Sequence, residues 1–130
     1  MRSDRYYYLN IYHDEQLSVD FDTQQLTDFI KSLSQFEQKE KFSFTNSKQF
    51  TVFTNITLLF ANQIHSWSSL DSGTRTNLVS IVCAKDPTVD FQIVQNVLVQ
   101  IATYLNWQWV DEQTDDEIEN FVLWKPRDRA

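Results

Sequence analysis

The spacing of hydrophobic side chains predicts two helices. Asp22 and Gln25 have the spacing of a capping box, and the apolar residues after them follow helical spacing. This pattern predicts an amphipathic helix over residues 23–36. Asp90 can cap a second helix, because the apolar residues that follow it form one helical face. We therefore expect another helix over residues 91–106.

Strands are predicted in much of the remaining chain. Tyr7, Leu9 and Ile11 alternate with a tyrosine-rich set of positions, which is typical of a strand with one inner face. The segment from Phe42 predicts a hairpin that turns near Asn46 and Ser47. The other predicted strands are residues 5–13, 51–61, 78–84, 107–112 and 118–125. Because residues 78–84 are continuously apolar, we expect them to form a central strand covered on both faces.

Together these elements predict an α+β fold. Its sheet is mostly antiparallel with five or six strands, and the two helices pack on one face. Residues 63–77 are polar and predict an extended loop. The length of 130 residues suits a single domain over residues 1–130. The residues expected to be almost fully buried are Leu78, Ile81, Val82, Val97, Leu98 and Ile101.

Composition narrows the setting in which the chain works. Cys83 is the one cysteine and lies in an apolar run, so it predicts a packed thiol and fits a reducing cytoplasm. We expect no membrane span and no signal segment. The formal net charge of −7 repels nucleic acid and anionic lipid but favours encounters with basic proteins.

Candidate catalytic groups are sparse. The two histidines are His13, beside Asp14, and His65 in a serine-rich stretch, and neither belongs to a recognised motif. One glycine in the chain disfavours phosphate-binding loops, and therefore nucleotide cofactors. We expect no enzymatic activity and no cofactor. Two alternatives stay open: a small enzyme or ligand-binding protein with a site near His65 and Trp67, or an adaptor subunit of a complex.

The densest charge is a run of six carboxylates near the end of the chain. Its members are Asp111, Glu112, Asp115, Asp116, Glu117 and Glu119. A calcium loop counted from Asp111 would place Asp116 at the turn glycine and Val122 at the bidentate glutamate, so we expect no metal site. The run predicts either a solvated hairpin tip or a partner-binding surface.

Tryptophans near this run favour the second interpretation. Trp107 and Trp109 precede it and Trp124 follows it, and aromatic anchors rimmed by charge are typical of interfaces. Because period two puts Trp107 and Trp109 on one face, at least one of them can instead belong to the core. We add Trp67 and Asp71, from the long polar stretch, to the predicted partner-binding residues.

Several segments together resemble small bacterial immunity proteins. They are Trp67-Ser68-Ser69-Leu70-Asp71, residues 76–85, Leu105-Asn106-Trp107, Asp115-Asp116 and Glu119-Asn120-Phe121-Val122-Leu123-Trp124. The likeness covers the chain from about Tyr6 to Trp124 and lies in its general character. Immunity proteins of contact-dependent growth inhibition and other polymorphic toxin systems are similarly short, acidic, cytoplasmic and built from one α+β domain.

The resemblance implies a function. Each such protein blocks one cognate toxin domain, often a nuclease with a basic surface. The expected partner is therefore a basic toxin domain, and the expected activity is inhibition through electrostatic and aromatic contacts.

Overall fold

The computed structural model describes residues 5–64, 70–71 and 73–126, which form two helices and ten strands. The helices are α1 (Thr23–Ser32) and α2 (Phe91–Leu105). The strands are β1 (Tyr6–Tyr12), β2 (Phe21–Asp22), β3 (Phe36–Glu40), β4 (Ser43–Asn46), β5 (Thr54–Phe60), β6 (Leu70–Asp71), β7 (Arg75–Thr76), β8 (Leu78–Ala84), β9 (Gln108–Gln113) and β10 (Glu119–Trp124). No helix within these ranges is long and apolar enough to cross a membrane.

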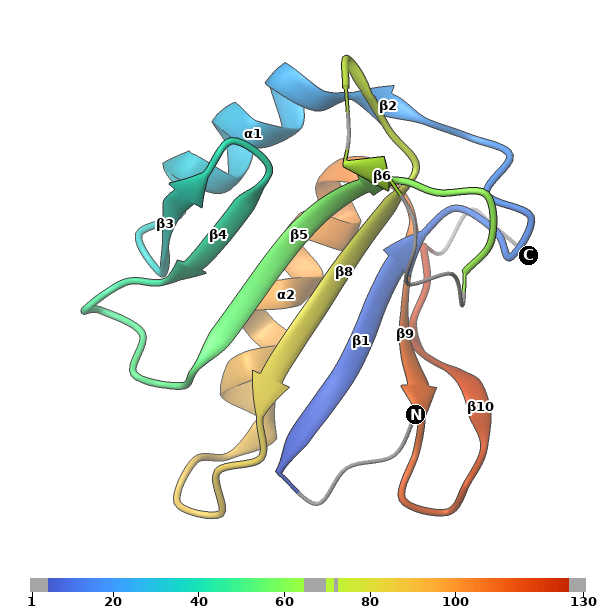
Figure 1. Cartoon of the computed structure of the whole chain (residues 1–130). Helices are drawn as coiled ribbons and strands as arrows, with labels where there is room; N and C mark the ends of the chain where they lie inside the picture. The colour runs from blue at the N-terminus through green and yellow to red at the C-terminus, as the bar shows by residue number, and fades with distance from the viewer. Residues whose placement is uncertain (1–4, 65–69, 72, 127–130) are drawn as a thin grey trace.

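Most strands join one antiparallel sheet, in the order β10-β9-β1-β8-β5-β4-β3, with the short β6 beside β5. Strands β2 and β7 form a separate two-stranded sheet. Both helices lie on one face of the large sheet, with α2 behind its centre (Figure 1). The α+β prediction is therefore confirmed. The sheet is wider than five or six strands, because charged β3 and short β6 lack the apolar alternation that predicts a strand.

The main core lies between the helices and the central strands β1 and β8. Leu9 and Ile11 of β1 pack there beside Val79 and Ile81 of β8, and the two strands are paired in register. The predicted inner face of β1 is thereby confirmed. Alternation along each strand directs these side chains toward the helices, so the apolar faces of sheet and helices bury one another.

Helix α2 has the bounds that its capping residues predict. The Asp90 carboxylate accepts a hydrogen bond from the Gln92 backbone N–H at 2.9 Å. At the other end Asn106 is left-handed, with φ of 60°, and its N–H bonds the last carbonyls of the helix. The face between these caps is buried at Val94, Val97, Leu98, Ile101, Ala102 and Leu105.

Helix α1 begins where the sequence predicts but ends earlier. Asp22 caps it by accepting from the Gln25 backbone N–H at 2.9 Å. The predicted end at residue 36 is wrong, because Leu33 is already extended and Phe36 starts β3. The Phe36 ring packs edge-on against that of Phe50, with centroids 5.9 Å apart. Phe36 has the spacing of a helical residue but belongs to a strand.

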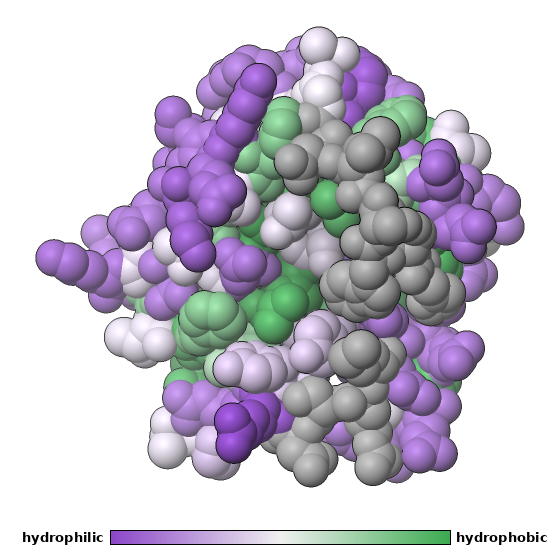
Figure 2. Space-filling view, in the orientation of Figure 1, coloured by the Kyte–Doolittle hydropathy of each residue, from purple (hydrophilic) through white to green (hydrophobic). Residues whose placement is uncertain are grey.

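The second face of the sheet is only partly covered. A smaller buried cluster forms there from Tyr12, Leu17, Ala61, Leu78 and Val110. In the view of this face, hydrophobic surface lies in the middle between hydrophilic margins (Figure 2). The expectation that β8 is covered on both faces is wrong for Val82, which is half-buried. Leu78 is buried because it belongs to the smaller cluster.

The connecting segments also depart from the sequence prediction. Strands β4 and β5 are antiparallel neighbours joined through residues 47–53, which agrees with a turn near Asn46 and Ser47. The stretch 63–77, predicted as an extended loop, contains β6 and β7 in its described parts. These strands are two residues long each, too short to produce a periodic pattern.

The packing of α2 generates the first prediction. Leu98 is fully buried in the main core, so Leu98→Ala leaves a cavity and should lower the free energy of unfolding by about 2–5 kcal/mol. Ile93 is half-exposed on the same helix, and Ile93→Ala should change it by less than about 0.5 kcal/mol. Urea denaturation of both variants is the measurement. Equal losses would contradict the assigned buried face.

Candidate protein-binding site

The acidic run forms a hairpin, as predicted, between β9 and β10. The two strands are paired antiparallel, with Glu119 opposite Gln113 and Phe121 opposite Asp111. The turn is closed by the backbone N–H of Thr114, which donates to the Ile118 carbonyl at 3.0 Å. Glu117 has a left-handed backbone with φ of 64°, which reverses the chain within a few residues.

The six carboxylates do not share one surface. Asp115, Asp116, Glu117 and Glu119 are exposed at the turn and the start of β10. Asp111 and Glu112 are only 8% and 6% exposed. This corrects the expectation that all six belong to one tip, because Asp111 and Glu112 belong to β9, which lies between β1 and β10. The accessible acidic surface consists of the other four residues, here called the hairpin carboxylates.

Asp111 lies on the helix side of the sheet. It pairs with Leu9 across β1, and its carboxylate accepts a hydrogen bond from the Gln113 backbone N–H at 3.1 Å. Loss of water around this buried carboxyl raises its pKa, against the lowering effects of the Gln113 bond and the Lys85 charge. The sequence gives this residue no feature that distinguishes it from the exposed carboxylates.

Two tryptophans, Trp107 directly before β9 and Trp109 within it, do not supply exposed anchors. Trp107 and Trp109 are both buried in the main core, and Trp109 stacks on Phe91 at 5.9 Å between ring centroids. Trp124 is half-buried and packs against the same core. The structural alternative for Trp107 and Trp109 is therefore the correct one. They secure β9 to α2 and leave the hairpin surface to other residues.

Apolar side chains that the sequence analysis missed are exposed on the hairpin. Ile118, Phe121 and Val122 are 48%, 45% and 41% exposed. Phe121 pairs with Asp111 and Val122 with Val110, so these two side chains emerge on opposite faces of β10. Their signal in the sequence is a lack of alternation in the last strand. Strand β10 is the outermost strand, so side chains on both of its faces can remain exposed.

Strand β10, at the outer edge of the sheet, is irregular. Pairing with β9 shifts register between Val122 and Trp124, and Asn120 is left-handed with φ of 50°. Its side-chain amide donates to the Glu15 carboxylate at 3.3 Å. Bulges and kinks of this kind discourage another strand from extending a sheet. Contact with a partner is therefore better served by the side chains of β10 than by its backbone.

Other predicted site residues lie elsewhere or outside the description. Trp67 and His65 fall outside the described residues. Asp71 belongs to β6, and nothing is described of its side chain. In Figure 1, β6 lies at the opposite end of the sheet from the β9–β10 turn, with β1 and β8 between β9 and the strand that β6 joins. Asp71 is thus not brought together with the hairpin carboxylates.

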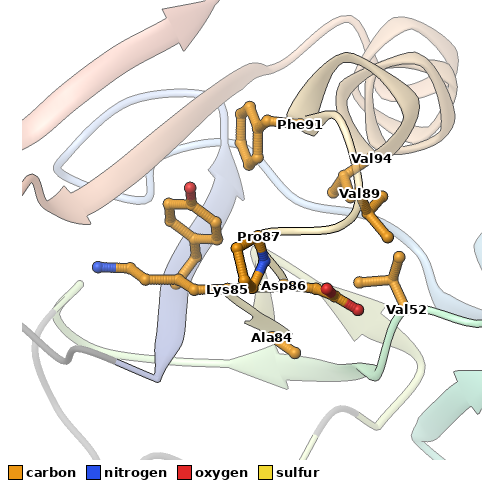
Figure 3. Close-up of a pocket in the computed structure, with 9 residues that line it drawn as sticks. Val52, Ala84, Lys85, Asp86, Pro87, Val89, Phe91 and Val94 are labelled. Atoms are coloured by element: carbon orange, nitrogen blue, oxygen red, sulfur yellow. The ribbon is translucent and has the colours of Figure 1, made fainter.

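Lys85 connects the hairpin to a pocket. Its amine lies 2.6 Å from Asp115 Oδ1 and 5.1 Å from the centre of the Tyr7 ring. The pocket has a volume of about 440 Å³, and Tyr7 and Lys85 are among the residues that line it (Figure 3). The β8–α2 connection and the β9–β10 turn lie at the same end of the sheet (Figure 1).

The remaining reactive groups have structural partners. Cys83 is fully buried, and this burial raises the pKa of its thiol, as the sequence predicts. Asp14 accepts from the Ser18 hydroxyl and lies 3.1 Å from His13 Nδ1. The pKa of Asp14 is lowered to about 2, chiefly by the Ser18 hydroxyl. Among the described residues, no group of three or more metal-ligating side chains could hold an ion.

Comparison with protein-family models, curated proteins and solved structures found no match to this chain. The site is therefore defined by its own geometry: four exposed carboxylates and three exposed apolar side chains on one edge hairpin.

The burial of Asp111 generates the second prediction. Its folded-state pKa lies above the ordinary 3.8, so its ionisation as pH rises through that folded pKa favours the unfolded chain. Below the ordinary value the group is protonated in both states, and no penalty remains. Asp111→Asn should therefore increase the free energy of unfolding at about pH 7 and have little effect near pH 3. Urea denaturation at both pH values measures this difference.

Asp116→Asn is the matched control, because Asp116 is exposed on the same hairpin. It should change stability by less than about 0.5 kcal/mol at either pH. An equal effect of Asp111→Asn at the two pH values would exclude relief of a buried charge as its cause.

Proposed function

We propose that this chain is a protein-binding inhibitor that works in the cytoplasm, in the manner of immunity proteins that neutralise a cognate bacterial toxin domain. The observation that carries the proposal is the hairpin surface, where exposed Ile118, Phe121 and Val122 lie among the hairpin carboxylates. Exposed apolar side chains with a charged rim are the usual composition of a protein interface.

The charge of this surface favours a basic partner. The surface carries the four exposed hairpin carboxylates, and residues 111–119 contain no lysine or arginine, in a chain with a net charge of −7. Such a field accelerates encounters with a basic surface, whereas desolvated apolar contacts slow dissociation. A basic toxin domain, such as a nuclease that binds phosphate backbones, has the complementary charge.

Co-expression with the products of the flanking genes tests this function. We expect one of these products to be toxic alone, to be harmless when this chain is present, and to co-purify with it in a fixed ratio. Toxicity should be assayed by growth and the complex by size-exclusion chromatography. A flanking toxin that remains fully active while bound to this chain would contradict inhibition.

The hairpin carboxylates should control the rate of association. A variant with Asp116→Asn, Glu117→Gln and Glu119→Gln leaves the Lys85–Asp115 pair intact and removes three charges from the surface. Its association rate with the partner should fall several-fold at low salt, and the salt dependence should shrink. Stopped-flow mixing or surface plasmon resonance across salt concentrations measures both quantities.

The control variant carries the same charge change elsewhere: Asp28→Asn, Glu37→Gln and Glu40→Gln on α1 and β3. It should retain most of the association rate, because only the overall charge has changed. Equal slowing in both variants would assign the effect to net charge and remove the hairpin from the interface.

The exposed Phe121 should control the rate of dissociation. Phe121→Ala should speed dissociation, whereas Phe60→Ala, at the far end of β5, should leave the dissociation rate unchanged.

A further inference from the structure

A pocket of about 440 Å³ opens beside the hairpin, between the end of β8 and the start of α2. Its walls are mostly apolar: Val52, Ala84, Pro87, Val89, Phe91 and Val94 line it together with Tyr7, Lys85 and Asp86. Val52 and Val94 are buried and form part of the main core. The volume is toward the lower end of the range of about 300–1,000 Å³ that is usual for ligand sites. This volume is sufficient for one large apolar side chain.

The aromatic wall of the pocket is held in place by its neighbours. The Phe91 ring lies 4.7 Å from that of Tyr7 and 5.9 Å from that of Trp109, measured between ring centres. Trp109 is fully buried, so the Phe91 ring rests on a fixed surface. A pocket whose walls are already ordered needs little rearrangement to accept an apolar group.

The two charged side chains at the mouth, Lys85 and Asp86, have different orientations and partners. In Figure 3 the Lys85 side chain points away from that of Asp86. Lys85 directs its amine to Asp115, whose side chain is 73% exposed. Asp86 is exposed and oriented by Thr88, whose backbone N–H and hydroxyl both donate to Oδ1, at 2.9 and 2.6 Å. The mouth therefore presents an oriented carboxylate, and the hairpin carboxylates continue the acidic surface beyond Lys85.

We propose that this pocket receives a large apolar side chain, of the size of phenylalanine or leucine, from a basic segment of the partner. The apolar walls take the side chain, while Asp86 faces the basic residues that flank it. This inference rests on the proposed function and names the part of the partner that docks beside the hairpin. Apolar anchors in preformed pockets commonly dominate the energy of an interface, and charged rims select the partner.

Short peptides test the pocket without the partner. The probe is an acetylated, amidated tripeptide of lysine, phenylalanine and lysine, added to the isotope-labelled full chain during two-dimensional NMR. We expect saturable shifts at the backbone amides of Ala84, Lys85 and Val89, with a dissociation constant on the order of 1 mM. Replacing the central phenylalanine with alanine, or both lysines with glutamate, should weaken binding about tenfold or more.

Two variants locate the binding. Val89→Asp places a carboxylate in the apolar wall and should abolish the shifts, whereas Ile93→Asp, on an exposed position of α2, should retain them. If Val89→Asp fails to fold, Asp86→Asn tests whether the peptide binds at the pocket. It should weaken the lysine peptide about two- to fivefold, and the distant control Asp28→Asn should leave the affinity unchanged.

Several outcomes would overturn the inference. Equal affinity for the phenylalanine and alanine peptides would remove the apolar anchor, and equal affinity for the lysine and glutamate peptides would remove the basic segment. Shifts confined to other parts of the chain would remove the pocket. None of these results depends on the toxin, so the pocket can fail while inhibition by the hairpin stands. Conversely, if the peptides bind as expected but the chain does not inhibit a toxin, the proposed function fails and the pocket stands.

Discussion

Packing of α2 against β1 and β8 is the interaction on which the position of every proposed contact surface depends. Leu98 and Ile101 are fully buried against the helix-facing side of these strands. The start of α2 then forms one wall of the pocket. The helix ends at left-handed Asn106, and Trp107 and β9 follow directly. This short connection places β9 beside β1.

The same packing explains why the hairpin projects as it does. Trp109 pairs with Ile11 across β1 and stacks on Phe91 of α2, which holds β9 from two directions. Beyond Glu112 the core no longer covers the hairpin, and residues 115–119 are all exposed. Strand β10 is attached to β9 alone among the described strands. The carboxylates and the exposed apolar residues are therefore carried on a rigid base at the margin of the sheet.

The sequence predicts those elements whose local pattern and tertiary role agree. Caps and one continuous apolar face define α2, and alternation defines β1. Prediction fails where the partner of a residue is distant: Phe36 continues the spacing of α1, yet its contact with Phe50 makes it the start of β3. Val82 belongs to an apolar run, but the face that it occupies is only partly covered. Neither outcome can be obtained from local periodicity.

The same limit of sequence prediction applies to individual residues of the candidate site. Six carboxylates in nine positions identify an acidic hairpin, but register with β1 decides which of them are buried. Exposure of Ile118, Phe121 and Val122 depends on β10 being outermost, which is a property of strand order.

The Lys85–Asp115 pair contributes little to holding the hairpin in place. Its carboxylate is 73% exposed, and ion pairs of that kind are worth about 0–1 kcal/mol because water screens them. The β9–β1 ladder and the two core tryptophans are buried, so they account for most of the stability of the hairpin base. Charge at the tip is consequently separable from folding. A surface on which charge can change without loss of structure is well suited to recognising one partner and rejecting others, since specificity then varies independently of stability.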